Sequence, residues 1–169
     1  MSLEERARAF ATERHSDIGQ LRKYTDEPYI NHPAAVVELV KTVWHTDSML
    51  AAAWLHDVVE DTKTSIEEIE DEFGMVVANY VEMLTDISVQ SDGNRATRKA
   101  IDREHTARAH PNAKTIKLAD LIDNSRSIID RDPKFAKVYL EEKRLLLEVL
   151  KEGDQTLWNQ ANEIVRNAS

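Results

Sequence analysis

The chain has 169 residues, which is enough for one domain with a real core and too few to suggest two. Hydrophobic residues make up 41% and charged residues 31%, as in ordinary globular proteins, while the formal net charge of −9 argues against a general nucleic-acid binder. The net charge does not exclude a small polyanionic ligand, provided that a local basic cluster or a bound cation binds it. With no cysteine, the chain can form neither a disulfide framework nor a thiolate metal site.

No apolar run approaches the roughly 20 residues of a membrane span, and residues 1–10 are charged where a signal peptide would be apolar. We therefore expect a cytoplasmic protein with neither a membrane nor a nucleic acid as its partner. Helical periodicity runs nearly from end to end, and no segment alternates with the period of two that is typical of a strand. These patterns predict an all-α single domain, a helical bundle over residues 1–169.

Taken in chain order, a capping box at Ser2 predicts a first helix that ends near His15. Residues 16–33 are irregular and contain several helix breakers. Pro33 suits the first position of a second helix, which we expect to end near Trp44. This half of the chain therefore predicts two helices joined by a structured connection.

A third helix carries the stretch "AAAWLHDVVEDT", residues 51–62, and we expect Asp47 or Ser48 to cap it. Ser65 begins another capping box, and Gly74 is placed to end that short helix. The remaining predicted elements are a helix at 75–87, a loop at 88–94, a polar helix at 95–109, an apolar helix at 113–129, a helix from Pro133 and a last helix capped by Asp154.

Four side chains with ligand or proton-transfer chemistry occur within two turns of the third helix: His56, Asp57, Glu60 and Asp61. Residues three and four apart share a helix face, so His56 lies over Glu60, and Asp57 over both acidic residues. An imidazole and a carboxylate suit a divalent first-row metal, and the acidic pair is then placed to handle a water. A solvated acidic helix end is the alternative interpretation of the same residues.

Asp120 lies in the middle of an apolar helix that should be largely buried. A buried carboxylate needs a cation, which is either a metal or the ammonium of Lys117 three residues earlier. Asn124 lies one turn further on and can donate to a ligand without adding charge.

His32 follows Pro28 in the stretch "PYINHP", just before a helix, where a rigid turn can point it inward. Together with His56, Asp57 and Asp120 it would form a site of two imidazoles and two carboxylates. Such a site leaves coordination positions open, as a catalytic metal requires. We assign no chemistry to the other histidines, which are His15, His45, His105 and His110.

"HP", "LHDVVEDT" and "IKLADLIDN" occur in an order that resembles the HD-domain metal-dependent phosphohydrolases. With "FATERHSDIGQLRKYTDEPYINHP", "FG" and "LTD" added, residues 5 to 130 resemble the hydrolase domain of the RelA/SpoT homologues, in particular the small alarmone hydrolases. In this interpretation, residues 133–168 are C-terminal helices outside the motif-bearing core. The resemblance implies an all-helical fold, a nucleotide as the small-molecule substrate, and an enzyme that removes pyrophosphate from the 3′ position of (p)ppGpp with manganese as cofactor.

The resemblance also implies roles for individual residues. His32, His56, Asp57 and Asp120 match the metal ligands, and Glu60 and Asp61 match an acidic pair that positions or activates the attacking water. Substrate contacts are implied for Arg22, Lys23 and Asn124, with the basic pair near the phosphates and base and the asparagine near the ribose. The other basic run, residues 95–99, we interpret as a solvated helix face.

The chain departs from the common family pattern at Val58, where a threonine is frequent, and at Ile122 and Asp123. None of these positions is a proposed ligand. They leave open an adenosine alarmone as substrate. Two further hypotheses also remain: a nucleotidase that releases orthophosphate from a nucleoside monophosphate, and a helical binding module without activity. The apolar stripe "YLEEKRLLLEVL" is compatible with the core and with a homo-oligomer interface.

Overall fold

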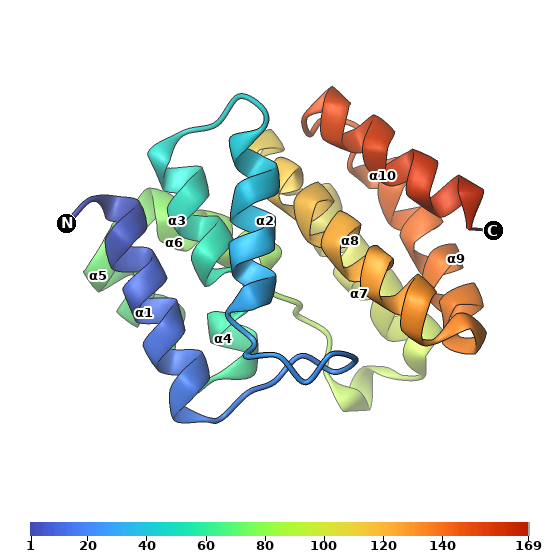
Figure 1. Ribbon diagram of the computed structural model, residues 1–169. Coiled ribbons are helices and arrows are strands. Elements are labelled where there is room, and N and C mark those ends of the chain that lie inside the picture. The colour runs from blue at the N-terminus through green and yellow to red at the C-terminus, as the bar shows by residue number, and fades with distance from the viewer. Residues whose placement is uncertain (169) are drawn as a thin grey trace. The chain divides into compact units, whose positions relative to one another are not determined.

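The computed structural model describes residues 1–168, and this part of the chain is helical, as predicted (Figure 1). It contains no strand in that range; its extended pairing is an isolated antiparallel bridge between Leu21 and Pro28. The chain divides into two compact units, Met1–Thr85 and Asp86–Ser169. The expectation that residues 1–169 form one domain stays a prediction.

The first unit contains six helices. In chain order they are α1 (Leu3–Asp17), α2 (Asn31–Lys41), α3 (Asp47–Leu55), α4 (Val58–Asp61), α5 (Ile66–Phe73) and α6 (Met75–Leu84). The centre of this unit is α3, which packs against α1, α2 and α6 (Figure 1). Because alanines make up three of its nine residues and its side chains from Met49 to Leu55 are all buried, the neighbouring helices approach it closely.

Helix caps in the first unit follow the sequence closely. The Ser2 side chain accepts from the backbone N–H of Glu5, and the Glu5 carboxylate accepts from the backbone of Ser2, which confirms the predicted capping box. Ser65 caps α5, and Gly74 ends it with φ of 90°, a value that favours glycine. The predicted cap of α3 is wrong, because Thr46 accepts from the backbone N–H of Met49.

The second unit contains a short 3-10 helix, η1 (Gln90–Asp92), and four α-helices. The four are α7 (Arg95–Ala107), α8 (Pro111–Arg131), α9 (Pro133–Val149) and α10 (Gln155–Asn167). α8 packs against α9 and α10, and α9 also packs against α7. On α8, most residues from Ala113 to Ile122 are buried, which confirms that this is an interior helix.

The connection between α9 and α10 brings Gly153 against α8. A Cβ atom at this position would lie 2.8 Å from Leu118 Cδ1 and 3.1 Å from the backbone at Lys114 and Thr115, so the turn requires glycine. Asp154 then caps α10 as predicted, because its carboxylate accepts from the backbone N–H of Leu157. Over residues 1–168, no helix combines the length and the apolar character needed to cross a bilayer.

Candidate metal centre

Three of the predicted metal ligands lie together in the first unit. His32 is in the first turn of α2, His56 is the C-terminal cap of α3, and Asp57 is the N-terminal cap of α4. The continuous helix expected through residues 51–62 is therefore interrupted between His56 and Asp57. This break lets two consecutive side chains serve one site, because they need not keep the 100° separation of neighbours on a helix.

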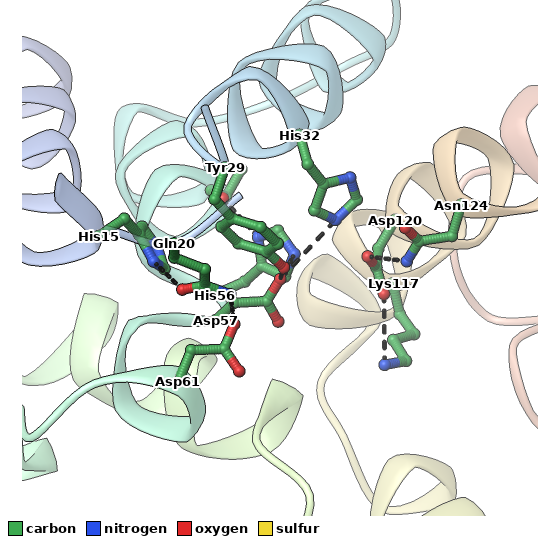
Figure 2. Close-up of polar contacts among 11 residues, drawn as sticks. His15, Gln20, Tyr29, His32, His56, Asp57, Asp61, Lys117, Asp120 and Asn124 are labelled. Carbon is green, nitrogen blue, oxygen red and sulfur yellow. Dashed lines mark hydrogen bonds and ion pairs between the residues drawn. The ribbon is translucent and has the colours of Figure 1, made fainter. Parts of the chain in front are cut away.

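The ligand atoms of these three residues converge (Figure 2). His56 Nε2 lies 3.0 Å from Asp57 Oδ2, and His32 Nε2 lies 3.7 Å from the same oxygen. The two imidazole rings have centroids 5.2 Å apart and planes inclined at 69°. Both histidines are buried, with 1% and 3% of their surfaces exposed, while Asp57 keeps 17% of its side chain exposed.

The hydrogen bonding of His56 assigns its tautomer. Nδ1 lies 2.7 Å from the carbonyl oxygen of Ala53, and because a carbonyl only accepts, Nδ1 carries the hydrogen. In the neutral ring, Nε2 then has a lone pair that faces the lone pairs of Asp57 Oδ2 at 3.0 Å. This arrangement is repulsive unless a cation, a bound metal or a ring proton, lies against both atoms.

These residues fit a divalent metal ion. Two ligand atoms that are each about 2.1 Å from one ion and at right angles to each other lie about 3.0 Å apart, which is the separation of His56 Nε2 and Asp57 Oδ2. The hydrogen bond from Nδ1 to a backbone carbonyl is also the usual support of a histidine ligand. The donor set, imidazole nitrogen with carboxylate oxygen, suits manganese, iron, cobalt or zinc.

Tyr29 contacts this cluster, although we assign it no role from the sequence. Its hydroxyl donates a hydrogen bond to Asp57 Oδ2, and its ring lies 5.8 Å from the ring of His32 between centroids. A hydrogen bond to a ligating carboxylate orients it and tunes its basicity. The signal was present in the sequence, since Tyr29 stands three residues before His32 in "PYINHP".

The predicted acidic pair, Glu60 and Asp61, lies on α4, the short helix that begins directly after Asp57. Both residues are exposed. Asp61 Oδ2 accepts a hydrogen bond of 3.1 Å from the amide of Gln20. The surrounding protein displaces part of the water around Asp61, and this effect, together with the negative charge of Asp57, raises the pKa of the Asp61 carboxyl above its ordinary value. A raised pKa makes the carboxylate a better proton acceptor.

Gln20 connects Asp61 to a second buried histidine. Because the Gln20 amide nitrogen donates to Asp61, its oxygen faces His15 Nδ1 at 2.9 Å as an acceptor. His15 is 2% exposed, and burial lowers the pKa of its ring, which favours the neutral form. Neither residue is assigned a role from the sequence, since the contact that links Gln20 to Asp61 joins residues 41 apart.

The predicted basic pair follows this turn. The backbone N–H of Arg22 donates to Glu27 O at 2.8 Å, and Asp26, with φ of 56°, donates to Arg22 O at 3.1 Å. These bonds close a tight turn that presents Lys23 at the surface, where its ammonium lies 5.3 Å from the centre of the Tyr24 ring. The structure thus gives the pair a defined backbone, while its part in substrate binding stays a prediction.

The fourth predicted ligand, Asp120, lies on α8 in the second unit and is 7% exposed. Within that unit, Lys117 Nζ lies 3.4 Å from Asp120 Oδ2, and Asn124 Nδ2 donates to Asp120 Oδ1 at 3.0 Å (Figure 2). Lys117 is the cationic partner that the sequence offered as the alternative to a metal. A lysine at one carboxylate oxygen does not exclude a metal at this residue, since a carboxylate has four lone-pair positions.

Comparison with known proteins gives a consistent result. Residues 7–145 match the HD domain family. The guanosine-3′,5′-bis(diphosphate) 3′-pyrophosphohydrolase MESH1 of Xenopus tropicalis is 42% identical over 122 residues, which are 70% of this chain and 65% of that protein. A probable guanosine-3′,5′-bis(diphosphate) 3′-pyrophosphohydrolase of Synechocystis is 39% identical over 73% of this chain and 16% of its own length. The chain thus spans about two thirds of the length of the Xenopus protein and a much smaller part of the Synechocystis protein.

A solved structure is similar over nearly the whole chain. It is described as a metazoan ortholog of SpoT that hydrolyzes ppGpp and plays a role in starvation responses. The two chains are 30% identical, with a TM-score of 0.86, and the similarity covers 99% of this chain and 96% of the other.

Proposed function

The chain belongs to the HD-domain family, as its motifs predicted, and from this premise we propose that it is a divalent-metal-dependent phosphohydrolase acting on guanosine alarmones. In this proposal it removes the 3′-diphosphate of ppGpp or pppGpp and leaves GDP or GTP with pyrophosphate. The proposal includes a cytoplasmic location. It is supported by the names of the relatives, MESH1 of Xenopus among them, and by the SpoT ortholog of similar fold.

The observation that supports it most strongly is the facing pair of His56 Nε2 and Asp57 Oδ2, 3.0 Å apart. In the neutral ring, the bond from Nδ1 to Ala53 O leaves a lone pair on Nε2, so the pair requires a nearby cation. A solvated acidic helix end has no need to bury an imidazole in this position, with 3% of its surface exposed.

We propose that His32, His56, Asp57 and Asp120 hold one metal ion, and that this ion is Mn²⁺. The first three converge within the first unit; Asp120 is included because it matches the family motif and is a buried carboxylate on an apolar helix. When bound, a divalent ion lowers the pKa of a coordinated water and polarises the phosphate. Tyr29, through its bond to Asp57, orients one ligand carboxylate.

Glu60 and Asp61 are proposed to move the protons. A bond forms between a water oxygen and the phosphorus attached at the ribose 3′ oxygen, and the bond from that phosphorus to the 3′ oxygen breaks. The water loses a proton, and the 3′ oxygen gains one. Asp61 suits the accepting role because its pKa is raised and because Gln20 fixes its carboxylate, which leaves Glu60 to assist the leaving oxygen.

Arg22, Lys23 and Asn124 are proposed to contact the nucleotide. The turn around Arg22 fixes its backbone, and a guanidinium binds a phosphate through two parallel hydrogen bonds or stacks on a base. Lys23 offers a point charge to the phosphates. Asn124, whose amide donates to Asp120, keeps its carbonyl oxygen as an acceptor for a ribose hydroxyl.

The test is a product assay. Purified protein, freed of metal with a chelator and reconstituted with Mn²⁺, is incubated with ppGpp, and the nucleotides are separated by anion exchange. We expect GDP and pyrophosphate in equal amounts, activity that is lost with the chelator, and no activity in His56→Ala.

Parallel incubations with other nucleotides test the alternative functions. Turnover of an adenosine alarmone at a higher kcat/KM would reassign the substrate, and release of orthophosphate from a nucleoside monophosphate would make the chain a nucleotidase. Failure to turn over any of these substrates with metal bound would leave a helical binding module and overturn the proposal.

A further inference from the structure

The second unit contains a pocket between α7, α8 and α9 with a volume of about 50 Å³, which we call the α7–α9 pocket. A water occupies about 10 to 15 Å³ on the same measure, so the pocket has room for three to five waters, or for a single phosphate group. Its lining is strongly charged. The charged side chains are Lys99, Asp102 and Arg103 of α7, Lys117 of α8, Glu142 and Lys143 of α9, and Asp86 of the segment between α6 and η1.

The two carboxylates from these helices are committed to other partners. Asp102 accepts hydrogen bonds from the backbone N–H groups of Ile87 and Ser88, at 3.0 and 2.9 Å, and from the Ser88 hydroxyl at 2.7 Å. Glu142 binds Arg95 through two parallel hydrogen bonds of 2.6 and 3.0 Å. Neither carboxylate therefore neutralises the cations of the pocket in full.

Three of the four cations are less well compensated. Lys117 pairs with Asp120 at 3.4 Å. For Lys99, Arg103 and Lys143, no carboxylate oxygen of residues 1–168 lies within 4.0 Å of the charged nitrogens. The Lys143 ammonium instead lies 4.8 Å from the centre of the Tyr139 ring. Burial, followed by the positive charges of Lys117 and Lys99, lowers its pKa to about 8.

We propose that the α7–α9 pocket is a binding site for a phosphoryl oxyanion, held by Lys99, Arg103 and Lys143. Lysine and arginine side chains carry hydrogen-bond donors and no acceptor atom, so these three residues match a ligand that only accepts hydrogen bonds. A tetrahedral phosphate offers acceptor oxygens in several directions, one to each cation. The volume selects a single phosphoryl group rather than a nucleoside.

Two kinds of molecule can supply this phosphoryl group: the nucleotide substrate, through one of its phosphates, and free phosphate or pyrophosphate. Lys117 connects the pocket to the proposed metal ligand, because it lines the pocket and pairs with Asp120. An anion in the pocket adds negative charge next to Lys117, so its binding and the charge at Asp120 should be coupled. All residues that line the pocket belong to the second unit, and the binding proposal does not depend on the proposed hydrolase activity.

Direct binding tests the pocket without any turnover. Calorimetric titrations of the full chain with inorganic phosphate and with pyrophosphate, in a metal chelator, compare the wild type with Lys99→Ala/Arg103→Ala and with Lys143→Met. The matched control is Arg108→Ala/Lys151→Ala, which removes two positive charges from exposed positions directly after α7 and after α9. We expect saturable binding of at least one anion, weakened at least tenfold by the pocket variants and less than twofold by the control.

Equal weakening in the control would mean that general charge, and not the pocket, attracts the anion, and the proposal would be wrong. Absence of binding to the wild type would overturn it as well. Circular dichroism checks that each variant is folded, and Lys143→Met remains informative if the double variant is not, because it replaces one side chain of similar length.

Steady-state kinetics then assign the source. If the pocket receives a substrate phosphate, Lys99→Ala/Arg103→Ala raises KM for ppGpp at least fivefold, and phosphate inhibits competitively. If it receives free phosphate, KM is unchanged, and the response of the rate to added phosphate disappears in the variant. A wild-type protein that binds phosphate but does not turn over ppGpp would overturn the proposed function while retaining the pocket.

Discussion

The His–Asp cluster of the first unit and the α7–α9 pocket of the second present opposite electrostatic situations. In the cluster, His56 Nε2 and Asp57 Oδ2 face each other at 3.0 Å, and in the neutral ring both atoms present lone pairs. In the pocket, Lys99, Arg103 and Lys143 gather without a carboxylate within ion-pair distance among residues 1–168. A cation would stabilise the first region, and an anion would stabilise the second.

This difference is informative because folding alone favours neither arrangement. Unfavourable electrostatics persist in a native structure when the rest of the fold over-determines them, and they occur most often at binding sites. A phosphohydrolase needs both kinds of site, a cation to activate water and positive charge to receive phosphate. We propose that each region meets one of these requirements by itself, the cluster in the first unit and the pocket in the second.

The largest effect should come from removing the proton-transfer pair next to the cluster. Glu60→Gln/Asp61→Asn keeps the shape of both side chains, and we expect kcat to fall about 1,000-fold, within the range for general acid–base groups. Mn²⁺ affinity should change little, because neither residue is a proposed ligand. The matched control is Glu67→Gln/Asp71→Asn on α5, which removes the same charge at exposed positions. Equal activity in the two double variants would contradict the assignment.

A smaller loss is expected from Tyr29→Phe, which removes only the hydroxyl that donates to Asp57. Such a supporting group typically contributes about 10- to 100-fold in metal affinity or activity. We expect the loss to appear as a higher Mn²⁺ concentration at half-maximal rate. Tyr80→Phe on α6 is the control for loss of a hydroxyl, and an unchanged metal requirement in Tyr29→Phe would show that Asp57 needs no support.

In the second unit, Lys143→Met should stabilise the protein, because it removes a cation whose charge burial disfavours. Its pKa falls from an ordinary 10.5 to about 8, so between these values the unfolded chain binds a proton that the folded chain does not. The free energy of unfolding of the wild type should therefore rise through this interval. The charges that set the shift are Lys99 on α7, Lys117 and Asp120 on α8, and Glu142 on α9.

After a discount for solvent screening, we expect Lys143→Met to gain about 1 to 2 kcal/mol at pH 7 and to lose that advantage near pH 10.5. Urea unfolding at both pH values measures this difference, with Lys134→Met at the exposed start of α9 as the control. A destabilised Lys143→Met at pH 7 would show that the ammonium is well solvated, and the contrast between the two regions would weaken.

The smallest effect is expected from Arg22→Lys, which keeps the charge and loses the two-pronged hydrogen-bond geometry. We expect KM for ppGpp to rise about fivefold, which corresponds to about 1 kcal/mol, with kcat nearly unchanged. Arg126→Lys, at an exposed position on α8, serves as the control. A fall in kcat without a change in KM would place Arg22 in the chemical step instead.

Much of the fold could be predicted because its signals are local. Ser2, Ser65 and Asp154 cap the helices that they were expected to cap, since a capping bond depends on a few neighbouring residues. The second helix was expected from Pro33 to near Trp44 and instead occupies Asn31–Lys41, a small difference of the kind that helix ends show.

The site was predicted less completely, because its supporting contacts join segments far apart in the sequence. The Tyr29 hydroxyl reaches Asp57 across 28 residues, and Gln20 reaches Asp61 across 41. The break between α3 and α4 places His56 and Asp57 together, and no proline or glycine marks it. Lys99, in a run interpreted as solvated, lines a pocket whose third wall comes from α9.

The most direct test of the central claim is a Mn²⁺ titration followed by electron paramagnetic resonance, on the wild type, His56→Ala and Asp120→Asn. We predict one tightly bound ion per chain in the wild type and a loss of affinity of at least about 100-fold in each variant, since each removes a proposed ligand. Wild-type affinity in Asp120→Asn would contradict a metal centre that requires α8, and a wild type that binds no Mn²⁺ would contradict the centre itself.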